Sequence, residues 1–293
     1  MSDSRGQGGV TAVKKAIIYP FARRFFAGET LGDVLVRVAQ VNRMGMSATI
    51  DFLGEDVAGL ADADAATAEY ARAVESAFDL GQDASVAIKL THIGLRVDKA
   101  RSLANLDRLA SLARSKGVFL WLDMEGSAYT DDTIAAYRRL LSDHFSVGIA
   151  LQSALNRTWD DLRGLVSEGA VVRLVKGAYR EGPDVAALDH ATIARRYAGM
   201  LEYLFANARQ FAAGTHDKAL IARAEEHLKF YKGAFEFQML MGMRDHVKRR
   251  LVADGHRVVE YVPYGTEWYN YGMRRIMEKR RNIVYFAQGL AGR

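Results

Sequence analysis

The chain has 293 residues, 49% of them hydrophobic, which is enough to bury a large core as one α/β barrel or as two smaller domains. The formal net charge of +5 suits anionic ligands, but zinc-finger spacing, RNA-binding aromatic motifs and dense Lys/Arg tracts are absent, so we expect no nucleic acid partner. The absence of cysteine excludes disulfides, iron–sulfur clusters, thiolate zinc sites and a cysteine nucleophile, and it suits a reducing compartment.

The first 27 residues differ in composition from the rest of the chain. Residues 1–9 are rich in Ser, Gly and polar side chains, and we expect them to be flexible. Residues 11–27 mix aromatic and apolar side chains with Lys and Arg, which is typical either of a basic amphipathic element on a membrane surface or of a helical arm docked on the protein's own core. No apolar run approaches the ~20 residues of a membrane span, so we expect a cytoplasmic protein that could contact the membrane peripherally.

From residue 28 onward, short apolar runs alternate with longer stretches of helical periodicity. The runs predict eight strands, at Ser47–Leu53, Ser85–Leu90, Val118–Met124, Val147–Gln152, Val171–Val175, Phe211–Thr215, Phe235–Leu240 and Arg257–Val262. The stretches between them predict helices at Ala61–Phe78, Asp98–Lys116, Thr133–Ser142, Trp159–Val166, Ile193–Arg209, Ala219–Phe230 and Met243–Ala253. Eight strands separated by helices predict a parallel sheet that closes into an α/β fold of the (β/α)8 TIM-like type over residues 28–293.

A doubly wound open sheet is the alternative architecture. Such folds carry a Gly-x-Gly-x-x-Gly turn between a strand and a helix when they bind dinucleotides. The nearest match, at residues 6–9, has no strand before it, which weakens this alternative.

Polar side chains gather where the predicted strands end, and this is the face on which (β/α)8 barrels carry their chemistry. They are Lys89, Asp123, Glu125, Gln152, Lys176, Thr215 and His216. Each alone could be a helix cap, a core group or a loop residue, but their convergence on one mouth is hard to explain by packing. Arg173 stands inside the apolar run Val171–Val175, so its charge must be paired or serve a ligand, because an unpaired buried charge is too costly.

Two common kinds of site find no support in the motifs. The seven histidines show neither His-x-His nor His-Glu-x-x-His spacing, so we predict no metal site. A Gly-x-Ser-x-Gly elbow for serine hydrolysis is also absent. What remains is a mouth rich in Arg, Lys and Tyr, which suits an anionic organic cofactor together with a carboxylate substrate.

The segment over residues 260–278 is the most informative part of the chain. A strand-like run ends at Pro263, and a helix begins shortly after it. On that helix Tyr271 shares a face with at least one of Arg274 and Arg275. Adjacent guanidinium groups bind carboxylates bidentately, although a solvated arginine pair is the alternative interpretation.

Four motifs together resemble one family. They are Tyr-Val-Pro-Tyr-Gly-x-x-Trp-x-x-Tyr-x-x-Arg-Arg-x-x-Glu from Tyr261, Val-Arg-Leu-Val-Lys-Gly-Ala-Tyr from Val172, Trp-Leu-Asp-Met-Glu from Trp121 and Phe-Glu-Phe-Gln-Met-Leu from Phe235. In their order and spacing, from about Phe26 to Asn282, they resemble proline dehydrogenase, the flavin-dependent enzyme of proline catabolism. The resemblance implies a distorted FAD-binding (β/α)8 barrel whose last helix lies over the barrel mouth.

The resemblance also implies an activity and partners. L-proline would be oxidised to Δ1-pyrroline-5-carboxylate by hydride transfer to FAD, and the electrons would pass to a membrane quinone. This would be the first step of proline catabolism to glutamate. The chain is too short to hold the aldehyde dehydrogenase part of multifunctional relatives, so a separate pyrroline-5-carboxylate dehydrogenase would act downstream.

The resemblance assigns roles to residues that match the motifs. The implied substrate contacts are Lys89, Tyr261, Tyr271, Arg274 and Arg275. Asp123, which would orient Lys89, and Arg173 are the implied catalytic residues. The implied FAD contacts are Met124, Gln152, Arg173, Lys176, Gly177, Ala178, Thr215 and His216.

Two other functions remain open at this stage. One is another flavin barrel that takes a nicotinamide donor, similar to methylenetetrahydrofolate reductase. The other is a catalytically inactive barrel that only binds an amino acid.

Overall fold

The architecture is a closed barrel of eight parallel strands, described by a computed structural model for residues 15, 17–143 and 146–277. The strands are β1 (Ser47–Phe52), β2 (Ala84–Ile88), β3 (Leu120–Leu122), β4 (Val147–Gln152), β5 (Val171–Val175), β6 (Gln210–Gly214), β7 (Ala234–Leu240) and β8 (Val258–Tyr264). Each strand pairs with the next along the chain, and β1 pairs with β8 to close the barrel. The prediction of a (β/α)8 barrel is therefore confirmed, and the open-sheet alternative is wrong.

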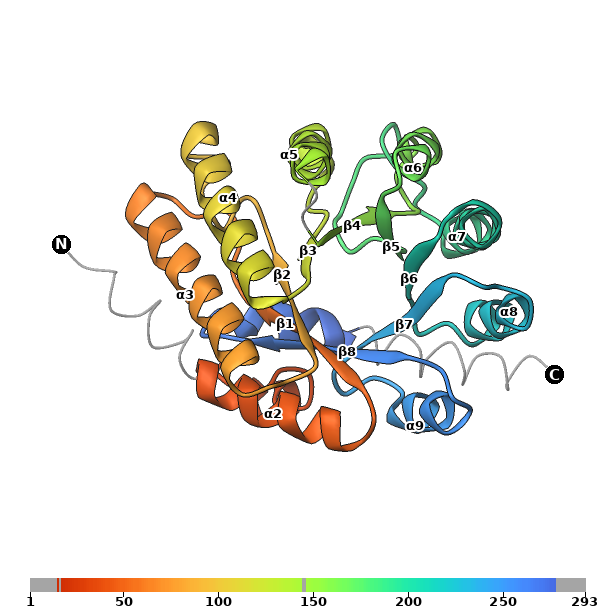
Figure 1. The fold of residues 1–293 in the computed structure, drawn as a ribbon, viewed down its shortest axis with the longest axis horizontal. Coiled ribbons are helices and arrows are strands. Elements are labelled where there is room, and N and C mark those ends of the chain that lie inside the picture. Colours follow the sequence, from red (N-terminus) through yellow and green to blue (C-terminus); the bar gives the residue numbers. More distant parts are fainter. Residues whose placement is uncertain (1–14, 16, 144–145, 278–293) are drawn as a thin grey trace.

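Helices form an outer ring around the strands (Figure 1). They are α2 (Leu31–Arg43), α3 (Leu60–Asp79), α4 (Lys99–Lys116), α5 (Thr130–Ser142), α6 (Thr158–Ser167), α7 (His190–Asn207), α8 (Lys218–Leu228) and α9 (Asp245–Ala253). The sequence did not predict α2, which begins with a capping box in which Thr30 and Asp33 exchange hydrogen bonds. No helix among the described residues is both long and apolar enough to cross a membrane.

Strands β4 and β5 have the predicted boundaries, the other six strands differ by a few residues, and the differences at β3 and β8 bear on the site. Strand β3 has three residues, so Asp123 lies just beyond it, although the Asp123 amide still donates to the Ile88 carbonyl at 2.9 Å. Strand β8 continues through Pro263, where the sequence predicted an end. Proline has no backbone N–H to donate to a neighbouring strand. The ladder between β7 and β8 stops at the pair Leu240–Tyr261, so Pro263 has no β7 partner to which it would need to donate.

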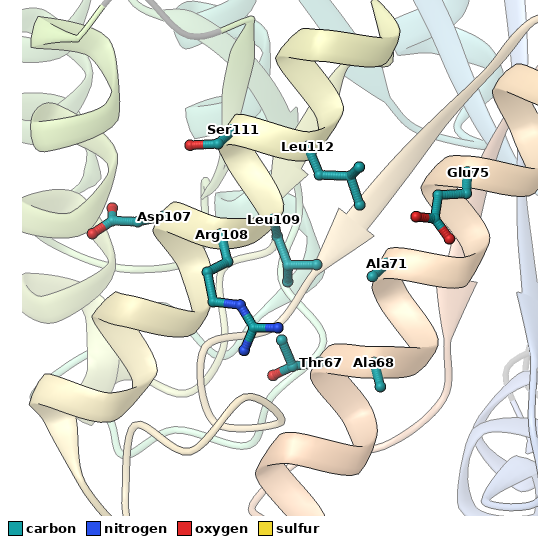
Figure 2. A pocket seen from close by; sticks show the side chains of 9 residues that line it. All are labelled: Thr67, Ala68, Ala71, Glu75, Asp107, Arg108, Leu109, Ser111 and Leu112. Carbon is teal, nitrogen blue, oxygen red and sulfur yellow. The ribbon is translucent and has the colours of Figure 1, made fainter.

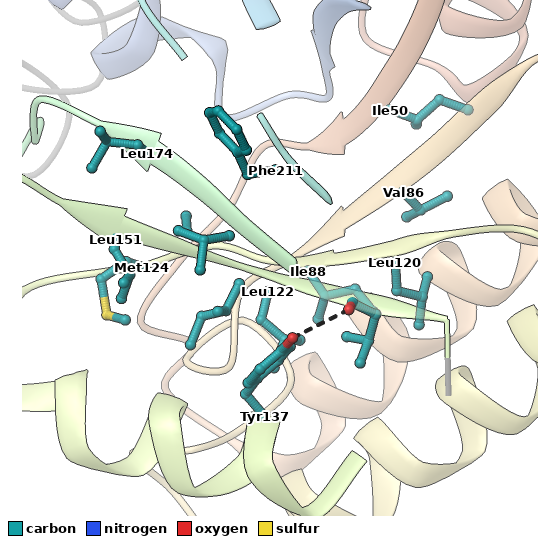
Figure 3. Packing of buried hydrophobic residues seen from close by; sticks show 14 of the residues in the cluster. Ile50, Val86, Ile88, Leu120, Leu122, Met124, Tyr137, Leu151, Leu174 and Phe211 are labelled. Atoms are coloured by element: carbon teal, nitrogen blue, oxygen red, sulfur yellow. Dashed lines mark hydrogen bonds between the residues drawn. The ribbon is translucent and has the colours of Figure 1, made fainter. Parts of the chain in front are cut away.

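Alternate residues of each strand face the helices or the barrel interior. On β3, Leu120 and Leu122 join the apolar core between strands and helices, part of which is drawn in Figure 3. Trp121 faces the interior instead, with Ala87 and Ala212. Gly148 makes room for the indole, because a Cβ there would lie 2.4 Å from the ring. Strand direction and alternation together decide which side chains reach the mouth.

A second apolar cluster joins the two ends of the described chain. Ala22, Phe25 and Phe26 of the N-terminal arm pack against Trp268 and Tyr271 of the last helix, and Leu53 at the end of β1 lies in the same cluster. Residues 268–277 are helical and pack beside Leu53 just after β1, whereas the expected position of this helix over the barrel mouth stays a prediction. The arm is helical at residues 17–22 and docks on the core. The predicted flexible residues 1–9 lie outside the described part of the chain.

Candidate active site

A lysine stands between two carboxylates at the centre of the mouth. Lys89 directly follows β2, and its Nζ donates to Asp51 Oδ1 of β1 at 2.5 Å. The same Nζ lies 3.2 Å from Asp123 Oδ2, just beyond β3. The side chains of Lys89, Asp51 and Asp123 are 13%, 2% and 14% exposed, so the cluster is largely removed from water. The predicted meeting of Lys89 and Asp123 is confirmed.

The other wall of this cluster comes from the second half of the barrel. Arg173 of β5 forms a salt bridge with Asp123 Oδ1 and donates to Gln238 Oε1 of β7 at 3.1 Å. Its guanidinium carbon lies 4.8 Å from the centroid of the Trp121 ring. The Tyr261 hydroxyl of β8 donates to Asp123 Oδ2 at 2.6 Å. The charge that the sequence placed inside an apolar strand is therefore paired.

The charges of Asp123 and Lys89 support each other, whereas burial raises the pKa of Asp51 even though Lys89 opposes this shift. Burial alone would raise the pKa of Asp123, but Arg173 and then Lys89 outweigh it and lower that pKa. Burial alone would lower the pKa of Lys89, but the Asp51 carboxylate, with further contributions from Tyr261 and Asp123, raises it well above the ordinary value. Lys89 is therefore held as an ammonium ion at the mouth, where it can attract a carboxylate.

The neighbouring strand ends carry groups suited to an anionic cofactor. Lys176 pairs with Asp217 at 2.8 Å and is only partly buried. Gln152 donates to the Glu125 carbonyl at 2.7 Å. The His216 Nε2 accepts from the Leu240 amide at 2.9 Å, which makes Nε2 the unprotonated nitrogen. Burial lowers the pKa of His216 to about 3, followed by the positive charge of Arg275, so the ring is neutral.

Two glycines near the ends of β5 and β6 are packed closely against neighbouring side chains. At Gly214, the last residue of β6, an added Cβ would lie 2.8 Å from Val175 Cγ1. At Gly177, φ is +118° and an added Cβ would lie 2.9 Å from Gln152 Oε1. A side chain at Gly214 would displace Val175, and one at Gly177 would displace Gln152, so glycine keeps the backbone of both segments close to these neighbours.

The two arginines of the last helix have different surroundings. Arg275 is 9% exposed, and its guanidinium carbon lies 5.5 Å from the centroid of the Tyr271 ring. Arg274 is exposed. Burial and then the positive charge of Arg275 lower the pKa of His216, which follows β6. Glu278, which follows one turn later in the sequence, lies outside the described residues.

Not every residue implied by the resemblance faces the mouth. Met124 belongs to the apolar core between strands and helices, and Figure 3 draws it there with Leu122 and Leu151. Thr215 is buried at the mouth, whereas Gly177 and Ala178 are exposed in the loop after β5. The cofactor contacts implied for these residues therefore remain a prediction.

The sequence analysis assigned no role to three features of the mouth, which are Asp51, Gln238 and the contact between Tyr179 and Glu55. Asp51 is a buried charge in the apolar run Ala48–Leu53, and the argument used for Arg173 would have found it. Gln238 faces the interior of β7 by simple alternation. Tyr179, beyond β5, donates to Glu55 Oε2 of the loop after β1 at 2.8 Å, and neither residue carried a signal beyond its position near a strand end.

A pocket on the outer surface of the barrel lies away from the residues of the candidate site. Figure 2 shows a pocket of about 540 Å³ between α3 and α4, on the outer ring of helices. Its lining includes Glu75, Asp107 and Arg108 but none of the mouth residues. Among the described residues, no group of three or more His, Asp or Glu side chains is arranged to hold a metal ion.

Comparisons with known proteins decide the family. The sequence profile of the proline dehydrogenase family matches residues 34–286. The chain belongs to the proline dehydrogenase family. It is therefore an oxidoreductase that acts on proline, as the four motifs implied.

Individual relatives agree with this membership. The chain is 32% identical over 272 residues to proline dehydrogenase 1 of Bacillus subtilis, and this alignment covers 92% of this chain and 90% of that protein. It is 33% identical over 285 residues to proline dehydrogenase of Deinococcus radiodurans, and this alignment covers 93% of this chain and 91% of that protein. A crystal structure of proline utilization A from Bdellovibrio bacteriovorus, inactivated by N-propargylglycine, superposes with a TM-score of 0.82 at 26% identity, over 92% of this chain but only 33% of that one.

Proposed function

We propose that this proline dehydrogenase oxidises L-proline to Δ1-pyrroline-5-carboxylate with bound FAD and passes the electrons to a membrane quinone. The observation that carries the proposal is the Lys89 ammonium, held charged between Asp51 and Asp123 at the mouth of the barrel. An anchored cation in a largely dry mouth suits the carboxylate of a small amino acid.

The substrate contacts follow from this arrangement. Lys89 and the partly buried Arg275 would bind the proline carboxylate from two directions, and the Tyr261 and Tyr271 rings would wall the pyrrolidine ring. A grip at several points fixes the orientation of the ring, which is what a hydride donor requires. No described side chain marks a general base for the substrate nitrogen, so we propose that proline binds with its amine already deprotonated.

The residues at the ends of β4, β5 and β6 would hold FAD. Lys176 offers a cation, and Gln152, Thr215 and His216 offer polar groups. Bound FAD would supply the acceptor for the hydride from proline C5. Arg173, fixed by Asp123 and Gln238, would contribute a positive charge close to the reaction.

The remaining partners belong to the same proposal. Ile17 and Phe21 on the helix at residues 17–22 are 61% and 67% exposed, which supports peripheral contact with the membrane that holds the quinone. The product would pass to a separate pyrroline-5-carboxylate dehydrogenase on the route to glutamate.

The absorbance spectrum of the purified protein tests this function. We expect a flavin spectrum that bleaches on anaerobic addition of L-proline and stays unchanged with NADH, and denaturation should release FAD. Bleaching with NADH alone would indicate a barrel similar to methylenetetrahydrofolate reductase. A protein that binds proline but takes up no flavin on reconstitution would be a binding protein only. Release of FMN in place of FAD would overturn the cofactor assignment.

A further inference from the structure

We infer that Asp51 is a positioning residue that holds Lys89 in place for the substrate carboxylate. The inference rests on the proposed function and extends it to β1, a strand to which the family motifs above assign no residue. Asp51 is 2% exposed and lies beside Ala87 of β2 and Pro263 of β8 in the strand register. Neither neighbour has a side chain that can pair with a carboxylate, so Asp51 turns to Lys89, two residues beyond Ala87.

Asp51 is the closer of the two anchors for the Lys89 ammonium. The Nζ–Oδ1 distance to Asp51 is 2.5 Å, against 3.2 Å to Asp123 Oδ2. Asp123 is also shared, because one of its oxygens binds Arg173 and the other accepts from Tyr261. Without Asp51, Lys89 would keep only the longer contact to a carboxylate that already has two other partners.

The number of donors explains why two carboxylates suit this lysine. An ammonium has three N–H donors on a flexible stem. With Asp51 and Asp123 each taking one, the contacts among the described residues leave one N–H for a ligand. Two fixed anchors therefore aim the third donor, which a single anchor would leave free to rotate.

Positioning can be separated from a simple effect of charge. Asp51, Asp123, Lys89 and Arg173 sum to zero, so the loss of one carboxylate gives the cluster a net positive charge. If charge alone mattered, Asp51→Ala and Asp51→Asn would both bind an anion more tightly. If positioning matters, Asp51→Ala weakens binding of the anion. Asp51→Asn keeps an acceptor oxygen for Lys89 and should retain most of the wild-type affinity for the anion.

The experiment measures binding of a carboxylate that cannot be oxidised. Cyclopentanecarboxylate has the ring and the carboxylate of the substrate, and cyclopentylmethanol has the ring without the charge. Calorimetry on the holoenzyme gives the affinity ratio of the two compounds for wild type, Asp51→Ala, Asp51→Asn, Lys89→Met and Asp51→Ala/Lys89→Met. Asp132→Ala is the matched control, since Asp132 accepts from Lys99 at the same 2.5 Å but on the outer surface.

We expect Asp51→Ala to lower the ratio at least ~10-fold, an effect of the size of a misplaced charge-assisted hydrogen bond. Asp51→Asn should stay within about 3-fold of wild type, and Asp132→Ala should match wild type. In the Lys89→Met background, Asp51→Ala should cause no further loss, because its effect passes through the lysine.

Each other outcome overturns the inference. If Lys89→Met lowers the ratio but Asp51→Ala does not, the inference fails and the proposed function stands. If Asp51→Ala lowers the ratio equally in both backgrounds, Asp51 supports the barrel in general. If Lys89→Met itself leaves the ratio unchanged, the carboxylate grip of the proposed function fails as well. Should Asp51→Ala not fold, a ratio for Asp51→Asn above that of wild type would show that charge and not position governs binding.

Discussion

Tyr261 of β8 donates a 2.6 Å hydrogen bond to Asp123 beyond β3, so the two residues meet across the mouth of the barrel. Asp123 also binds Lys89 and Arg173, so this one carboxylate is shared by partners from β5, from β8 and from the residue that follows β2. A carboxylate in this position does more than orient a single lysine.

Asp123→Ala should cost more than Lys89→Met. Asp123→Ala leaves the buried Arg173 guanidinium without its carboxylate, which costs about 3–5 kcal/mol of stability. In Lys89→Met, Asp123 keeps Arg173 and Tyr261, and the Asp51 carboxyl that loses Lys89 can take up a proton, because burial raises its pKa. We expect kcat/KM for L-proline to fall at least ~10-fold further in Asp123→Ala than in Lys89→Met. Tyr261→Phe, which removes only the hydroxyl, is the control for the hydrogen bond. Equal losses in the two variants would restore a simple Lys89–Asp123 pair.

The two arginines of the last helix should differ in effect. Arg275 is largely buried against Tyr271 and Arg274 is exposed, so we expect Arg275→Met to raise the KM for L-proline about 30- to 1000-fold. Arg274→Met should have a smaller effect, because an exposed charge is screened by solvent. Steady-state kinetics with an unchanged flavin spectrum would establish this. Unchanged KM values in both variants would show a solvated arginine pair instead.

Gly177→Ala should destabilise the protein by about 1–3 kcal/mol and weaken FAD retention. Its backbone has a positive φ, and the new Cβ would displace the Gln152 side chain. Gly117→Ala is the matched control, since Gly117 also has a positive φ but no atom within 4 Å of the added Cβ. Urea denaturation and flavin content after gel filtration measure the two effects. Equal flavin loss in both variants would contradict a role of Gly177 at the proposed FAD site.

The stability of the protein should depend on Glu125 across neutral pH. Burial raises the pKa of this carboxyl from its ordinary 4.5 to about 7, even though Thr91 donates to it from both its amide and its hydroxyl. The folded state holds the proton more tightly, so a contribution of roughly 3 kcal/mol is present below pH ~4.5 and is lost as pH rises through about 7.

Glu125→Gln removes this titration. The difference in unfolding free energy between the variant and wild type should therefore shift in favour of the variant between pH 5 and pH 8. His92 and His216, whose pKa values burial lowers to about 3, are present in both proteins and cancel in the comparison. A difference that stays constant with pH would place the Glu125 titration outside this range.

The sequence predicted the barrel and most of the mouth because both follow from local patterns. Apolar runs alternate with helical stretches, and parallel strands bring their carboxyl ends to one rim. Arg173 could be identified because a charge in an apolar run demands a partner. Asp51 met the same condition four strands earlier, but it lies one residue before the end of β1, whereas most of the predicted site residues lie at or beyond strand ends.

Other features depend on contacts that no local pattern contains. Pro263 continues a strand only because β7 has already ended beside it. Which partner Lys89 prefers depends on how Asp123 is shared with Arg173 and Tyr261, and these residues lie far apart in the chain. Met124 matched a family motif, yet the alternation of β3 turns it toward the helices.

The closure of the barrel has a consequence for any attempt to divide it. The first four strands carry Asp51, Lys89 and Asp123, with a net charge of −1, and the last four carry Arg173, with a charge of +1. Fragments separated at the exposed Gly169 between α6 and β5 would each present an uncompensated ion to its missing counterpart. Reassociation of the two polypeptides would neutralise both, so flavin uptake by a mixture of them would report directly on complementation between half barrels.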